Sequence, residues 1–221
     1  MAQAASRLFG PGSDLVAKLI LLAFAGVLLA GFAWWIFAPR TDYATAVGWV
    51  LDQPVPFSHE HHVSGLGLDC RFCHMTVEHE ATAGMPTTDT CMTCHSQVWT
   101  NAALLAPVRE SFAKHAPIVW NRVNAVPDYV YFNHGIHISK GVGCAECHGD
   151  VGRMALTQKA RSFEMSFCVD CHRDPAPRLR PKTALFDTEW HRTADTPSPA
   201  ALAAAYHLGT RNLTDCSICH R

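Results

Sequence analysis

The sequence predicts a mainly α, loop-rich domain that follows one N-terminal transmembrane helix. Three observations support this fold class. Residues 19–38 form an uncharged run of twenty mostly apolar side chains. Strand-like alternation of apolar and polar residues is scarce after Thr41. All ten cysteines fall into five copies of one pentapeptide, CxxCH. We therefore expect a membrane anchor over residues 1–40 and a second domain over residues 41–221.

The apolar run is long enough to cross a membrane. Twenty helical residues rise about 30 Å, the thickness of the bilayer's hydrocarbon core. Lys18 and Arg40 flank the run, and Trp34 and Trp35 lie where a belt of interfacial aromatic residues is expected. A cleaved signal peptide is the alternative, because residues 44–46 offer an A-x-A pattern. The run exceeds the usual length of a signal peptide's apolar region, so we expect an uncleaved single-span anchor.

The CxxCH pentapeptide is the attachment sequence of a c-type haem. Its two thiols bond to the vinyl groups of the porphyrin, and the histidine binds the iron as the proximal ligand. Five copies with no cysteine left over predict five covalent haems c, and therefore a multihaem cytochrome c domain. The predicted attachment residues are Cys70, Cys73, Cys91, Cys94, Cys144, Cys147, Cys168, Cys171, Cys216 and Cys219. The predicted proximal iron ligands are His74, His95, His148, His172 and His220.

Other uses of these cysteines explain the pattern less well. A zinc ribbon does not need a histidine directly after each cysteine pair. A disulfide framework would not repeat one spacing five times, and iron–sulfur clusters use other spacings. Since few residues serve each haem, the porphyrins should form most of the core. We expect the domain to remain unfolded without them.

The haem domain contains an imperfect repeat. Residues 57–62 and 132–137 both have the pattern F-x-H-x-x-H, and each is followed by two CxxCH motifs. We therefore predict two-haem modules over residues 57–95 and 132–172. The fifth haem lies at the C-terminus, after a linker rich in proline, alanine and threonine. The segment between the modules has no recognisable chemistry, and we expect it to pack against porphyrin edges.

The repeated turns provide candidates for the distal iron ligands. A low-spin haem used for electron transfer takes a second strong ligand, histidine or methionine. Histidines at positions i and i+3 of a helical turn project to one side, so they can reach two irons. The four distal candidates in the turns are His59, His62, His134 and His137.

The distal ligand of the fifth iron is less well defined by the sequence. His207 lies nine residues before Cys216, and His191 and His115 are weaker alternatives. Met165 is also a candidate, and thioether ligation would raise the potential of its haem. A methionine beside a haem can also simply pack there, because its thioether fills gaps against aromatic surfaces.

The F-x-H-x-x-H elements resemble those of class III multihaem cytochromes. Residues 130–149 and 165–173, with one span and five haem motifs, resemble the pentahaem cytochrome c subunit of bacterial alternative complex III. A related subunit occurs in periplasmic quinone reductase complexes. The resemblance implies an electron-carrier subunit rather than an enzyme. It would relay electrons through five haems from a quinol-oxidising membrane partner to a soluble cytochrome c or a terminal oxidase.

The resemblance also implies partners and a location. The partners would be iron–sulfur and multi-span quinol-oxidising subunits. Because haem c is attached outside the cytoplasm, we expect the haem domain on the periplasmic side of the cytoplasmic membrane. The net charge of −1 gives no indication of a nucleic-acid partner.

Two other functional classes are less favoured. A membrane-anchored quinol dehydrogenase of the NapC/NirT type, feeding a periplasmic reductase, shares the anchor and a methionine after the first haem histidine, here Met75. Such proteins usually carry four haems, and their first motif follows the span closely, whereas about thirty residues separate Ala38 from Cys70 here. A catalytic multihaem enzyme needs an open iron position. Five proximal histidines and nine further histidines disfavour one.

Overall fold

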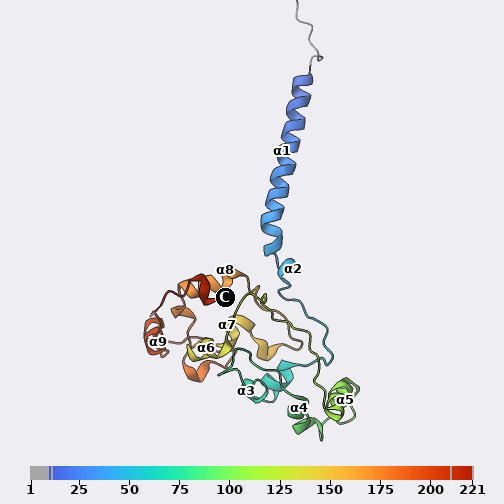
Figure 1. The fold of residues 1–221 in the computed structure, drawn as a ribbon, viewed down its shortest axis with the longest axis vertical. Helices are drawn as coiled ribbons and strands as arrows, with labels where there is room; N and C mark the ends of the chain where they lie inside the picture. Colours follow the sequence, from blue (N-terminus) through green and yellow to red (C-terminus); the bar gives the residue numbers. More distant parts are fainter. Residues whose placement is uncertain (1–9, 11, 210, 221) are drawn as a thin grey trace, which may run out of the picture. The chain divides into compact units, whose positions relative to one another are not determined.

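The computed structural model describes residues 10, 12–209 and 211–220 of the chain. The chain divides into two compact units, residues 1–46 and residues 47–221, which are described separately (Figure 1). Part of the predicted anchor, residues 1–9 and 11, lies outside the described residues.

The first unit is dominated by one long helix. Helix α1 (Ser13–Phe37) contains the apolar run, and none of its residues is buried. A 3₁₀ turn, η1 (Ala38–Arg40), and the short helix α2 (Asp42–Thr45) follow it. The helical segment Ser13–Arg40 is long and apolar enough to cross a membrane.

The second unit consists of short helices joined by loops. Its described residues form no named strand and only three isolated β-bridges. Its α-helices are α3 (Cys70–Cys73), α4 (Thr88–His95), α5 (Ala106–Lys114), α6 (His134–Ser139), α7 (Cys144–His148), α8 (Met165–Arg173) and α9 (Pro199–Ala205). A π-helical turn, η2 (Glu60–Gly65), and the 3₁₀ turns η3 (Ala103–Leu105), η4 (Val151–Arg153), η5 (Ala176–Arg178), η6 (Lys182–Ala184) and η7 (Cys216–Ile218) complete the unit.

Each CxxCH motif lies on a helix or begins one. Helices α3 and α7 and the turn η7 start at the first cysteine of their motif, whereas α4 and α8 contain their motifs entirely. Asp69 and Asp215 precede two of these starts, and each side chain accepts a hydrogen bond from the backbone N–H two residues later. Such caps fix the start of a helical turn. The turn then places the two cysteines, three residues apart, on one face.

The apolar core of the second unit is small. Two clusters of buried side chains stand out, one around Val77, Ile138 and Leu185 and the other around Leu179, Leu202 and Tyr206. So few buried apolar side chains do not stabilise a unit of this length by themselves. The core therefore agrees with a fold that depends on a further group.

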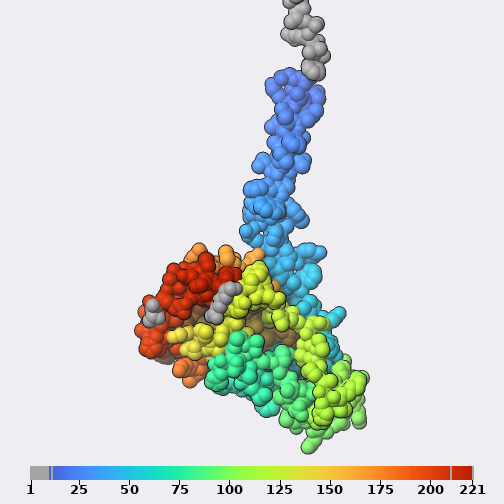
Figure 2. All heavy atoms as spheres, viewed as in Figure 1, coloured from blue at the N-terminus to red at the C-terminus, as the bar shows by residue number. Residues whose placement is uncertain are grey.

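The helices of the second unit follow one another across its width. Helix α5 packs against α4, and η2 packs against η4. Figures 1 and 2 show α4 and α5 at one end of this unit, α6 and α7 in its middle, and α8 with the C-terminal residues towards the other end.

Candidate haem-binding sites

We number the five CxxCH sites in sequence order: site I (70–74), site II (91–95), site III (144–148), site IV (168–172) and site V (216–220). All five predicted proximal histidines have a hydrogen-bonding partner at Nδ1. The partners are the carbonyl of Gly84 for His74 (2.7 Å), Val98 for His95 (3.1 Å), Leu213 for His172 (2.8 Å) and Tyr129 for His220 (3.1 Å), and the side-chain amide of Asn124 for His148 (3.2 Å).

The four distal candidates from the repeated turns share this property. The partners at Nδ1 are the carbonyl of Ser58 for His62 (2.8 Å), Asn133 for His137 (2.7 Å) and Ala81 for His134 (2.8 Å), and the hydroxyl of Thr157 for His59 (3.0 Å). An imidazole that donates its Nδ1–H to a fixed acceptor presents the lone pair of Nε2. Eight of the nine histidines have an oxygen at Nδ1 and are therefore oriented as metal ligands usually are, whereas His148 has the amide nitrogen of Asn124 there.

Three of the distal candidates face a proximal histidine at one common separation. The ring centroids are 6.2 Å apart for His62 and His95, 6.4 Å for His134 and His148, and 6.1 Å for His137 and His172. A histidine–metal bond of about 2 Å on each side, plus about 1 Å from each nitrogen to its ring centre, gives roughly 6 Å across one metal ion. The observed spacing fits two axial ligands of one iron.

The fourth pair follows the same register. His59 precedes His62 by three residues, as His134 precedes His137, so it corresponds to the ligand of the first site in its module. Burial lowers the pKa of His59 to about 4, and His74 is the first of the neighbouring charges that act in the same direction. Burial also lowers the pKa of His148 to about 4. Both imidazoles are therefore neutral at pH 7, the form that binds metal.

A phenylalanine orients both histidines in each turn. The Phe57 ring stacks on His62, with centroids 4.5 Å apart, and meets His59 edge-on at 4.9 Å. In the second turn, the ring of Phe132 stacks on His137 at 4.4 Å and meets His134 edge-on at 4.7 Å. Because stacked and edge-on contacts are the favoured aromatic geometries, one phenylalanine fixes two ring orientations in each turn.

The cysteines and acidic residues form no competing metal or disulfide site in the part of the chain that is described. All ten cysteines are free thiols. Within the described residues, no group of three or more His, Cys, Asp or Glu side chains is arranged to hold a metal ion. The donor set therefore fits iron held from two sides inside a porphyrin, with the cysteine pairs free to bond to it.

Comparison with known proteins also points to haem binding. Residues 130–221 match the family model described as cytochrome c7 and related cytochrome c. This C-terminal part of the chain, which contains three of the five CxxCH motifs, therefore resembles cytochrome c7-like multihaem cytochromes c. It is also similar to the multihaem cytochrome c subunit of menaquinone reductase from Nitratidesulfovibrio vulgaris. The two are 29% identical over 205 residues, which cover 90% of this chain and 88% of the relative. The predicted fold class, a helix-rich multihaem domain with one N-terminal apolar helix, is confirmed.

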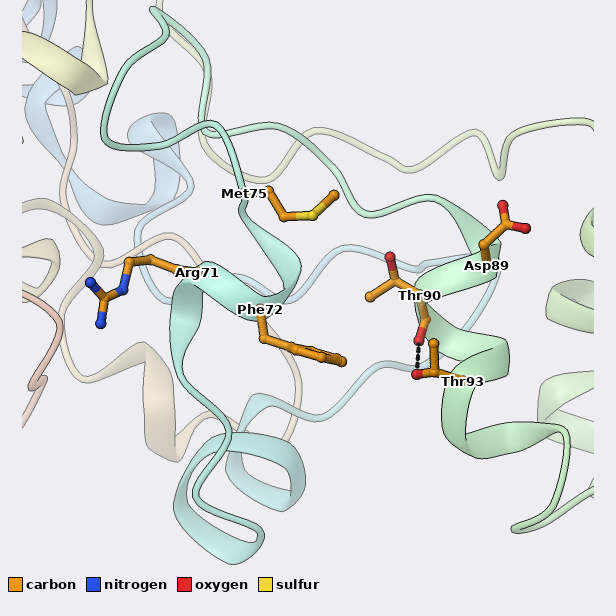
Figure 3. Close-up of a pocket in the computed structure, with 6 residues that line it drawn as sticks. All are labelled: Arg71, Phe72, Met75, Asp89, Thr90 and Thr93. Atoms are coloured by element: carbon orange, nitrogen blue, oxygen red, sulfur yellow. Dashed lines mark hydrogen bonds between the residues drawn. The ribbon is translucent and has the colours of Figure 1, made fainter.

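A pocket of about 420 Å³ lies between the first two CxxCH motifs (Figure 3). Phe72 and Met75 line it from the side of α3, and Thr90 and Thr93 line it from α4. The pocket is open and mainly apolar. Apolar side chains beside attachment cysteines suit contact with a porphyrin, so we assign the pocket to the haem sites.

The fifth site has no distal candidate among the repeated turns, and none of its candidates contacts His220 in the described structure. His207 follows α9 in a left-handed backbone conformation, with φ of 53°. Met165 begins α8 and is 71% exposed. Within the described residues, no ring contact or hydrogen bond joins His207, His191, His115 or Met165 to His220. The distal ligand of site V remains a prediction.

Two side chains near the axial histidines have no signal in the sequence. Asn124 lies in the segment between the modules, 24 residues before His148, and Thr157 lies 98 residues after His59. Oδ1 of Asn124 is buried without a partner in the described structure. Turning the amide places this acceptor on Nδ1 of His148. The inter-module segment therefore contributes a hydrogen bond to a predicted iron ligand.

Proposed function

We propose that this cytochrome relays electrons through five covalent haems c within a membrane quinone oxidoreductase complex. The observation that carries the proposal is the set of facing histidine pairs described above. An iron with a histidine on each side has no open position for a substrate, so it serves electron transfer rather than catalysis. The haem supplies one-electron redox chemistry when bound, and the protein supplies ligands, orientation and burial.

The proposed ligand assignment follows from the three ring pairs and, for His59 with His74, from the shared spacing of the two turns. The CxxCH cysteines carry the haems, and the proximal and distal histidines are His74 with His59, His95 with His62, His148 with His134, and His172 with His137. His220 holds the fifth iron, with His207 or Met165 as its distal candidate. In each turn, the first histidine serves the nearer motif and the second serves the farther one. This assignment supports the modules over residues 57–95 and 132–172.

We further propose that α1 anchors the chain in the cytoplasmic membrane, with the haem unit on the periplasmic side. Its length and uncharged surface support this role. The partners would be the iron–sulfur and multi-span quinol-oxidising subunits of an alternative complex III, with a soluble cytochrome c or a terminal oxidase as acceptor. The relative's subunit name supports a quinone-linked complex in general.

The same name favours a second candidate that differs in direction. The relative is named as a subunit of a menaquinone reductase, an activity that delivers electrons to a quinone. In this candidate, the same haem relay carries electrons towards the membrane quinone rather than away from a quinol. The ligand assignment is identical for both candidates.

Native mass spectrometry of the complex, isolated through this chain in mild detergent, tests the proposal. We expect co-purification with an iron–sulfur subunit and multi-span membrane subunits, and five haems on the denatured chain. A double variant, Cys216→Ala with Cys219→Ala, should carry four haems and calibrates the count. Recovery of the chain alone, or with only a periplasmic reductase, would reject the complex in favour of the NapC/NirT-type alternative. Haem reduction by added quinol, or haem oxidation by added quinone, then distinguishes the two directions.

A further inference from the structure

Sites I and II are neighbours. The pocket between α3 and α4 is lined from both motifs, by Arg71 and Phe72 on one side and by Thr93 on the other. The thiol of Cys73 lies close to that of Cys91. Burial is the main cause that raises the pKa of Cys73, and the neighbouring Cys91 is the next. The turn that carries His59 and His62 reaches both sites. The two attachment edges therefore face each other.

Site I also adjoins site III, although 70 residues separate their motifs. The thiol of Cys70 lies 3.7 Å from the carbonyl oxygen of Phe186, and the backbone N–H of Cys144 donates to the carbonyl of Leu185 (3.1 Å). The two cysteines thus contact consecutive residues, 186 and 185, of one segment. The neighbouring Cys70 thiol raises the pKa of Cys144. The edge of site I that does not face site II therefore faces site III.

A loop of the first module strengthens the junction between sites I and III. Gly84 accepts the Nδ1 hydrogen bond of His74, and Ala81 accepts that of His134. The N–H of Gly135 donates to the carbonyl of Glu80 (3.0 Å). A Cβ at Gly135 would lie 2.9 Å from the backbone of this loop, so only glycine permits the close approach.

Sites III and IV are joined through α6 and through a pair of phenylalanines. His134 and His137 lie on α6 and face the histidines of sites III and IV. The ring of Phe163 contacts His148 (6.4 Å) and also Phe167 (5.8 Å), the residue before the first cysteine of site IV. After burial, the neighbouring thiols Cys171 and Cys168 contribute to the raised pKa of Cys147, about 11.

Site IV adjoins site V. The carbonyl of Leu213, three residues before the last motif, accepts the Nδ1 hydrogen bond of His172. Burial is the main cause that raises the pKa of Cys168, and the neighbouring thiol of Cys219 is the next. Exposure gives independent support for the two ends of the row. Of the ten cysteines, only Cys94 and Cys216 are exposed, and they belong to sites II and V.

We infer that the haems form a row in the order II–I–III–IV–V, so that site II is an end of the relay and site I is internal. With haem bound at every site, each step would move one electron from one site to its neighbour, so that one haem is oxidised as the next is reduced. Since tunnelling slows steeply with distance, electrons follow neighbouring sites rather than the order of the motifs in the sequence. The inference rests on the proposed function and adds the path. In the alternative, sequence order I–II–III–IV–V, site I would be the end.

Two haem-deletion variants distinguish these orders. Cys91→Ala with Cys94→Ala removes haem II, and Cys70→Ala with Cys73→Ala removes haem I. An oxidised haem carries positive charge that raises the potential of an adjacent haem, so removing a haem lowers the potentials of its neighbours. The measurement is a potentiometric titration of the full chain in mild detergent, followed optically and by EPR so that individual haems are resolved.

The two orders predict opposite results. In the inferred order, loss of haem II lowers the potential of one remaining haem, whereas loss of haem I lowers two. Sequence order predicts two for haem II and one for haem I, and that result would overturn the inference. If the haem I variant does not assemble, the haem II variant alone decides, because its site lies at the exposed end. Haem counts and subunit composition of the unaltered protein report separately on the proposed function.

Discussion

The turns at residues 57–62 and 132–137 reach one geometry from different sequences. The first continues into the π-helical turn η2, which begins at Glu60 and contains His62, and the second forms the start of α6. In each, a polar residue after the phenylalanine caps the turn. Ser58 Oγ accepts from the N–H of His61 (3.1 Å), and Asn133 Oδ1 accepts from the N–H of Ile136 (3.0 Å). A phenylalanine, a cap and two histidines three residues apart therefore recur with one geometry in both turns.

The turns differ in what surrounds these ligands. His59 is hydrogen-bonded by a side chain, Thr157, whereas His134 is hydrogen-bonded by the backbone of residue 81. The second histidines also differ, because the ring planes of His62 and His95 are inclined by 69°, and those of His137 and His172 by 29°. The repeated element sets which ligands reach the iron. The rest of the fold sets the electronic environment of each iron.

The largest effect is expected when haem is withheld, because both turns then lose the groups that they would hold. Expression of the full chain without haem attachment should leave residues 47–221 unfolded, because the described apolar core is small and both turns lack the groups they would hold. Circular dichroism should then show helix only in an amount that α1 can account for, with no cooperative thermal transition. A cooperative transition of the haem-free chain would contradict this expectation.

Removing the second histidine of each turn tests whether the turns are equivalent. We expect His62→Ala and His137→Ala each to convert one haem of five from low spin to high spin, at sites II and IV respectively. Optical and EPR spectra of the detergent-solubilised protein measure the change. His61→Ala, next to His62 but outside the repeat pattern, is the matched control and should leave all spin states unchanged. High-spin haem in the control, or none in the variants, would reject the assignment.

The ring-plane angles predict a spectroscopic difference between sites II and IV. Nearly perpendicular axial imidazoles make two iron d orbitals almost equal in energy, which increases the largest g value of a low-spin ferric haem. We therefore expect site II, at 69°, to show a larger maximum g value than site IV, at 29°. The signals lost in the His62→Ala and His137→Ala variants identify which is which. Equal g values would show that the two sites are not distinguished by this angle.

The smallest expected effects concern the two side-chain partners. Loss of the acceptor at Nδ1 weakens electron donation from the imidazole to iron, so Asn124→Leu should raise the potential of haem III. A hydrogen bond of about 1 kcal/mol corresponds to about 40 mV for one electron. Thr157→Val should raise the potential of haem I in the same direction.

Controls for this prediction use the same titration. Asn124→Asp keeps the acceptor and adds negative charge, so it should lower the potential of haem III instead. Thr193→Val serves as a matched control for Thr157→Val, because its hydroxyl contacts only Thr196 among the described residues. A shift in the Thr193 variant, or none in either test variant, would show that these hydrogen bonds do not tune the haems.

Much of this architecture follows from short-range sequence patterns. The helices at the CxxCH motifs, the long apolar helix and the lack of sheet depend on local spacing and composition, and the structure shows all three in its described part. The facing of His134 with His148 and of His137 with His172 agrees with the i, i+3 pattern that suggested two irons. These features arise within one helical turn or one motif.

The remaining features depend on how distant segments meet. The contacts of Asn124 with His148 and of Thr157 with His59 join segments that share no pattern. The order of the sites depends on Cys70 and Cys144 meeting at residues 185–186, which no local rule predicts. The distal ligand of site V could not be predicted for the same reason. The spacing of its candidates in the sequence does not determine which of them meets His220 in the fold.

The Nδ1 hydrogen bonds of His59 and His134 each join one module to the other, which has a consequence for how the unit opens. In the proposed assignment each module provides both ligands for its own irons, yet Thr157 of the second module hydrogen-bonds to His59 of the first, and Ala81 of the first hydrogen-bonds to His134 of the second. The copies of the duplicated unit are thus interlocked. A chain cut between the modules, within residues 96–131, would give halves that each retain their own histidine pairs. Each half would lose the one hydrogen bond that the other half provides to its first distal histidine. Amide hydrogen exchange should therefore show a single opening unit across residues 57–172 rather than two independent ones.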